Sequence, residues 1–111
     1  MADITAYVEN VKHYTAMVDE VAVAGVVKHC GIALQSKDAS LVAASDPEEL
    51  ARVRESFCKK KLARTEDDSA LDSAIGGIMT QMKAERNKSR VTVYYLLAEK
   101  FGQLGLFHPK S

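Results

Sequence analysis

Apolar side chains recur every three or four residues along most of this chain, the spacing that gathers them on one face of an α-helix. The pattern is strongest near the middle of the chain, at Leu71, Ile75, Ile78, Met79 and Met82. No convincing run of β-strands accompanies it. The spacing therefore predicts an all-α fold, a bundle of five or six helices in a single domain.

Capping residues and helix-stop signals divide this pattern into segments. Asp19 and Asp46 are typical N-caps, Pro47 suits the first turn of a helix, and Gly31 suits a helix end. A polar break at 65–68 precedes the strongest amphipathic segment. The expected helices are 3–14, a segment from after Asp19 to Cys30, 47–61, a segment after 65–68, and a last helix from Ser89 or Arg90 to Phe101.

Residues 32–44 carry a weaker signal. Asp38 could cap a short helix through Leu41, Val42 and Ala44. Serine and alanine dominate the segment, however, and a β-strand is the alternative.

The last expected helix is apolar nearly all round, with Thr92, Glu99 and Lys100 as its polar exceptions. A helix of this kind belongs at the centre of a bundle. Leu104, Leu106 and Phe107 would then fold back as a docked tail. The expected core comprises Leu50, Val53, Phe57, Leu71, Ile75, Ile78, Met82, Tyr94, Leu97 and Phe101.

Two glycines, Gly76 and Gly77, interrupt the amphipathic segment, where each costs about 1 kcal/mol relative to alanine. We expect another backbone to approach this small-residue strip closely in compensation. A phosphate loop is excluded because neither its GxxxxGK[ST] pattern nor a preceding strand is present.

The 111 residues fit one domain, 1–111, and a composition of 47% hydrophobic and 27% charged residues is typical of a soluble globular chain. The start lacks the features of a secretory signal, and no apolar run approaches a membrane-spanning length. We therefore expect a cytoplasmic protein without a membrane segment. In a reducing compartment we expect Cys30 and Cys58 to be buried like small hydrophobic residues and not to form a disulfide.

Charge is balanced overall, with 15 basic and 15 acidic residues, but it is distributed unevenly. Residues 1–50 hold eight acidic and three basic residues, and residues 51–111 hold seven acidic and twelve basic residues. One basic group is the candidate for nucleic-acid or polyanion binding: Arg52, Lys59, Lys60, Lys61 and Arg64. On a helical wheel these residues point to several sides, so nucleic acid is the less favoured partner.

A second basic group precedes the last helix and forms a candidate anion site: Arg86, Lys88, Ser89 and Arg90. Asn87 or Ser89 would cap the helix, whose free N–H groups attract anions. The alternative is that a carboxylate from the acidic first half already occupies this position as an internal salt bridge.

No spacing of catalytic or metal-ligating residues is recognisable. The available ligands are His13, His29, Cys30, Cys58 and His108, without any CxxC, HxxxH or HExxH pattern. Nucleophile signatures such as GxSxG are also missing. We therefore expect no metal, no cofactor and no enzymatic activity, while the oligomeric state cannot be read from the sequence.

Three stretches resemble a small bacterial family catalogued as domain of unknown function 2853. They are Gly31–Leu34, Ala43–Ala51 and Lys83–Glu99, of which the run Arg-Val-Thr-Val-Tyr-Tyr-Leu-Leu-Ala-Glu is the most specific. The resemblance implies a small, all-helical cytoplasmic protein and no assigned activity. We expect a non-catalytic helical interaction protein with a protein partner, and the alternative is a weak polyanion or nucleic-acid binder that uses the basic second half.

Overall fold

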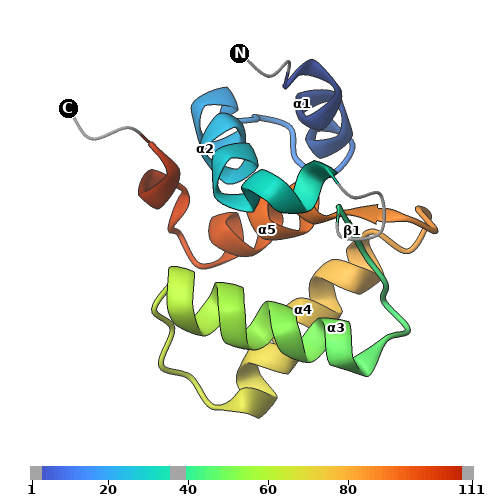
Figure 1. The fold of residues 1–111 in the computed structure, drawn as a ribbon, viewed down its shortest axis with the longest axis vertical. Helices are drawn as coiled ribbons and strands as arrows, with labels where there is room; N and C mark the ends of the chain where they lie inside the picture. The colour runs from blue at the N-terminus through green and yellow to red at the C-terminus, as the bar shows by residue number, and fades with distance from the viewer. Residues whose placement is uncertain (1–3, 36–39, 109–111) are drawn as a thin grey trace.

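Helix α5 (Arg90–Lys100) lies at the centre of the computed structural model, which describes residues 4–35 and 40–108. Every residue from Arg90 to Ala98 is buried. Helices α1 (Thr5–Lys12) and α2 (Glu20–Cys30) pack on one side of α5, and α4 (Asp68–Gln81) packs on the other (Figure 1). The expected all-α fold with a buried C-terminal helix is confirmed.

Aspartate side chains start three of the helices, as the capping signals predict. Asp19 accepts a hydrogen bond from the Ala22 N–H, and Asp67 accepts one from the Ala70 N–H. Asp46 accepts from Glu48 and Glu49 ahead of α3 (Pro47–Arg52). Each carboxylate satisfies N–H groups that have no partner within the helix.

The expected helix 47–61 is continuous but changes type along its length. After α3, residues Val53–Lys61 (η2) form a π-helix, in which the chain winds more widely than in an α-helix. Its last turn closes with the Leu62 N–H donating to the Phe57 carbonyl at 2.8 Å. Ala63 then adopts a positive φ of 54° and turns the chain toward α4.

The short-helix interpretation of residues 38–44 is wrong at Leu41–Val42, which form strand β1. This strand pairs antiparallel with β2 (Lys88–Ser89) just before α5. Asp38 lies outside the described residues. A 3-10 helix, η1 (Gly31–Gln35), follows α2 at the expected stop, where Gly31 has a φ of +49°.

Three further expectations need correction. Helix α1 is shorter than 3–14, with Asp3 outside the described residues. Leu50 and Phe101 are only partly buried, whereas the other eight expected core residues are buried. Gly76 and Gly77 are exposed, and outside α4 itself no heavy atom of the described residues lies within 4 Å of a Cβ built at either position, so no other described backbone approaches them.

The C-terminal segment folds back as η3 (Leu104–Phe107) and packs against α2. Phe107 is buried and Leu104 is partly buried, as expected of a docked tail. Leu106 instead is 48% exposed. Figure 1 shows this segment at the edge of the molecule, beside α2 and the end of α5.

Candidate functional site

The residues of the predicted anion site differ in exposure, and two of them are already bonded within the fold. Arg86 is exposed, whereas Lys88 is buried and its Nζ donates to the Glu85 carbonyl at 2.7 Å. Ser89 stands at the N-cap position of α5 without a side-chain capping hydrogen bond and pairs with Leu41 in the small sheet. The Arg90 N–H donates to the Ser40 carbonyl at 2.9 Å, so the first N–H of α5 is already bonded.

The Arg90 side chain forms a buried ion pair with Glu49 of α3. It also donates to the Tyr94 hydroxyl at 2.9 Å and to the Leu41 carbonyl at 3.3 Å. Burial disfavours the charged guanidinium, but its contacts with Tyr94 and Glu49 raise the pKa of Arg90 overall. Glu49 belongs to the acidic first half of the chain. Its carboxylate therefore forms the internal salt bridge that was the alternative to a bound anion.

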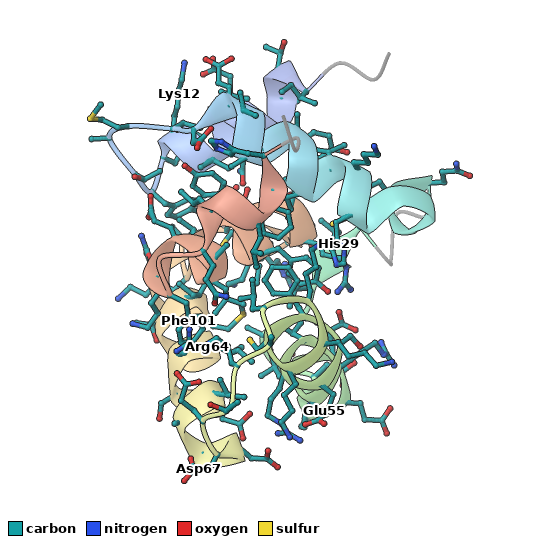
Figure 2. All side chains as sticks on the ribbon, turned by 90° about the vertical axis from the view of Figure 1, so that its left-hand side faces the viewer. Lys12, His29, Glu55, Arg64, Asp67 and Phe101 are labelled. Atoms are coloured by element: carbon teal, nitrogen blue, oxygen red, sulfur yellow. The ribbon has the colours of Figure 1, made fainter. Side chains whose placement is uncertain are left out.

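Most of the predicted polyanion-binding residues are paired with carboxylates of the chain. Arg52 lies 2.6 Å from Glu49, Lys59 lies 2.6 Å from Asp68, and Arg64 lies 2.6 Å from Glu66. Arg64 also lies over the ring of Phe101 at 4.4 Å, and Figure 2 shows the two side chains together. Lys60 and Lys61 are the members of this group for which no ion pair occurs within the described part of the chain.

A groove of about 460 Å³ lies where α2, the end of η2 and the C-terminal segment meet. We call it the α2–η3 groove. Helix α2 supplies one wall, η2 supplies a single lysine, and the C-terminal segment supplies the other wall. Its lining residues are Val21, Ala24, Gly25, Lys28, His29, Lys61, Leu106, Phe107 and His108.

An aromatic stack supports the groove from the core. The Phe57 ring lies on the Tyr94 ring with centroids 3.9 Å apart and an interplanar angle of 13°. Phe107 lies parallel to Phe57 at 6.0 Å, so the wall of the groove is joined through η2 to α5. Because such contacts fix ring positions in a close-packed interior, this wall is held in place by the core.

Two basic side chains sit against these rings. The Lys61 Nζ lies 5.4 Å from the Phe107 ring centroid, within the range of a cation–π contact. His29 lies 5.8 Å from the Phe57 ring and 6.2 Å from the Phe107 ring. Burial lowers the pKa of His29, and the charge of Lys61 lowers it further. In Figure 2, His29 is seen between α2 and η2.

The C-terminal wall is fastened to α2 at two points. The His108 Nε2 lies 2.5 Å from the Asp19 carboxylate at the start of the helix. In the middle of the helix, a Cβ built at Gly25 would overlap the Phe107 carbonyl oxygen and lie 2.7 Å from the Phe107 Cβ. Glycine at position 25 therefore permits the segment to cross α2 in contact with its backbone.

Sequence reasoning did not group the residues of this groove. From the sequence, His29 and His108 stand out only as possible metal ligands, and Lys28 does not stand out. The available signals were Gly25 inside an apolar helical segment, which often marks a close approach, and Lys28 and His29 together in its last turn. Neither signal identifies the segment that crosses the helix.

Within the described ranges 4–35 and 40–108, no three histidine, cysteine, aspartate or glutamate side chains come together as metal ligands. Cys30 and Cys58 are buried and unbonded, and burial raises the pKa of each thiol to about 11. The same ranges contain no helix that combines the length and the apolar character needed to cross a membrane.

A family model described as "Protein of unknown function (DUF2853)" matches residues 6–105, which confirms the family that the sequence resembles. No curated protein matches the chain. The matched range contains six of the nine groove-lining residues, and Leu106, Phe107 and His108 follow it directly.

Proposed function

The chain belongs to the DUF2853 family, and we propose that this member is a non-catalytic helical interaction protein of the cytoplasm, which binds a protein partner in the α2–η3 groove. The observation that carries the proposal is the clustering of exposed apolar side chains at this groove. Among the described residues, the exposed large hydrophobic side chains are those of Met17, Val21 and Leu106. Val21 and Leu106 both line the groove.

Exposed apolar side chains gathered at one concave place are typical of interaction sites. Met17, 87% exposed, lies in the segment that leads into α2, only a few residues before Val21. A partner that covers the groove would remove the side chains of Val21 and Leu106 from water. The free energy gained scales with the apolar area buried, at about 25 cal/mol per Å².

The groove is also supported rigidly, because the Phe107–Phe57–Tyr94 stack joins its wall to the central helix. A preformed surface loses less conformational entropy on binding than a mobile one. Polyanion binding by the basic second half has less support, since Arg52, Lys59 and Arg64 are already close to carboxylates. Such a ligand would have to displace those pairs.

Site-specific photo-crosslinking tests the proposal. A benzophenone amino acid is placed at Ala24, which is exposed in the groove, or at Ala70, which is exposed on α4. We expect a discrete adduct in the cytoplasmic fraction from position 24 and not from position 70. Excess unlabelled protein should compete for this adduct, whereas the Val21→Ser/Leu106→Ser double variant should not.

Equal adducts from positions 24 and 70, or no adduct at 24, would refute docking at this groove. Competition by the double variant as strong as that of the unsubstituted protein would also refute it. The two serine substitutions lie at exposed positions, so the fold should persist, which circular dichroism and thermal unfolding check.

A further inference from the structure

We infer that the α2–η3 groove recognises an acidic peptide segment of the partner, with carboxylates at Lys28 and Lys61 and an apolar side chain against Val21 and Leu106. This inference rests on the proposed function and adds the chemistry of the partner. It depends on three features of the groove, which are its unpaired cations, its lack of acidic lining and its apolar wall.

The two lysines come from different elements and face one groove. Lys28 is exposed near the end of α2, and Lys61 is half-buried at the end of η2. Within the described ranges neither lysine has an ion pair, whereas neighbouring Arg54, Lys59 and Arg64 each lie close to a carboxylate. Positive charge at the groove is therefore left for a partner to neutralise.

The lining contains two lysines, two histidines and no acidic residue. Asp19 contacts His108 of the lining, and its carboxylate is occupied by His108 and by the Ala22 N–H. Burial lowers the pKa of His29, and the positive charge of Lys61 lowers it further. A basic segment would meet only repulsion here, and like-charge contacts exclude wrong partners.

The apolar wall of the groove favours a peptide over a nucleic acid as its ligand. Val21 and Leu106 are each 48% exposed and can be covered by an aliphatic or aromatic side chain. Single-stranded RNA instead binds by stacking bases on exposed rings. The phenyl rings here are packed against one another, with Phe57 fully buried and Phe107 only 5% exposed. The combination of cations and aliphatic surface therefore favours an acidic segment with an apolar anchor.

Titration of the ¹⁵N-labelled protein with three synthetic peptides tests the inference. The first is acetyl-Asp-Glu-Leu-Phe-Glu-Glu-amide, the second carries Asn and Gln in place of its acids, and the third carries lysines there. We expect the acidic peptide to shift the amides of Val21, Lys28, Lys61 and Phe107. The uncharged peptide should bind about tenfold more weakly, and the advantage of the acidic peptide should shrink as NaCl is raised.

The Lys28→Glu/Lys61→Glu double variant should lose this advantage, and Lys60→Glu is the matched control. Lys60 is exposed, adjacent in sequence and outside the groove lining, so its reversal should change the affinity less than about twofold. A well-dispersed amide spectrum of each variant shows that it is folded.

Equal affinity for the acidic and uncharged peptides would overturn the inference, as would shifts confined to other surfaces or an equal effect of Lys60→Glu. Oligouridylate that displaces the peptide and binds the groove more tightly would assign the site to nucleic acid instead. The crosslink at position 24 separates the two proposals. If it forms and is competed equally by the Lys28→Glu/Lys61→Glu variant, partner docking stands and the acidic preference fails.

Discussion

Gly25 lies in the middle of α2, where the C-terminal segment crosses the helix. A side chain at this position would overlap Phe107, whereas Gly76 in the middle of α4 has open space around it. Both glycines are helical, and each lowers helix stability relative to alanine. Their substitution by alanine therefore separates the cost of a steric clash from the intrinsic preference of the helix.

We expect Gly25→Ala to displace η3 from α2 and to lower the free energy of unfolding. Gly76→Ala should raise it by about 0.5–1 kcal/mol, because alanine fits there without strain and restricts the unfolded chain. Urea unfolding measures both effects. Amide hydrogen exchange at Phe107 should accelerate in Gly25→Ala only, and unchanged exchange there would contradict the assigned contact.

The Glu49–Arg90 ion pair joins α3 to α5 in a buried position, with each side chain 9% exposed. Removal of one partner leaves a buried charge without compensation, so Glu49→Leu should cost about 3–5 kcal/mol. The Glu49→Leu/Arg90→Met double variant removes both charges and should recover a large part of this loss. Chemical denaturation of the single and double variants measures the coupling; simple additivity would contradict it.

Tyr14 belongs to a polar network that connects α1 to the end of the α4 segment. Its hydroxyl donates to Glu85, whose other carboxylate oxygen accepts from the Asn10 Nδ2 at 2.7 Å. Burial, together with this hydrogen bond and the charge of Glu85, raises the pKa of Tyr14 from 10.0 to about 12. The folded state therefore favours the neutral hydroxyl.

The stabilisation from Tyr14 should be complete below about pH 10 and should be lost as the pH rises to about 12, because the unfolded chain releases this proton first. Tyr14→Phe should lower stability at neutral pH and flatten the loss between pH 10 and 12. Urea midpoints across this range check the result. Part of the alkaline loss should remain, since burial also raises the pKa of Tyr94 and Tyr95; an unchanged slope would contradict a role for Tyr14.

At the scale of elements, the aspartate caps set where helices begin. Asp67 accepts from the Ala70 N–H at 2.8 Å and precedes α4, which carries five buried side chains. Asp67→Ala should lower the free energy of unfolding by about 1 kcal/mol, whereas Asp67→Asn should retain most of the cap. Thermal or urea unfolding distinguishes them; equal losses would assign the effect to the charge of Asp67 rather than to its hydrogen bond.

The type of a helix is harder to predict from the sequence than the residue at which it begins. Residues 47–61 were predicted as one helix, and one continuous helix is present, but η2 is wound as a π-helix. Apolar spacing does not distinguish the two forms over so short a segment. The wider winding sets the direction of each side chain in η2, including Lys61 at the groove, and can be seen only in the packed structure.

For the whole molecule, α5 is covered by α1 and α2 on one side and by α4 on the other. Its amides should become accessible only when the molecule unfolds globally, whereas η3 at the edge should open locally. Native-state hydrogen exchange in increasing urea should therefore give Val93–Leu97 the free energy of global unfolding and give η3 a smaller value. Similar protection in both segments would contradict this order.

Ion pairs form both within the basic half of the chain and between its two halves. Arg54 pairs with Asp72, Lys59 with Asp68, and Arg64 with Glu66. Contacts between the two halves include Glu49–Arg90 and Asp19–His108. These pairs leave Lys28 and Lys61 as the cations that face the groove, which a count of charges along the chain does not show.

The helices can be predicted from the sequence alone because they depend on interactions between residues close together in the chain. The period of apolar residues, the aspartate caps, the stop at Gly31 and the mostly apolar α5 depend on neighbours within a few residues. Tertiary structure decided the rest, because residues distant in the chain had to meet. How the helices pack decides that Phe107 meets Gly25, that Glu49 pairs with Arg90, and that Lys28 and Lys61 line one groove. Local spacing carries no information about which distant surface covers a given face.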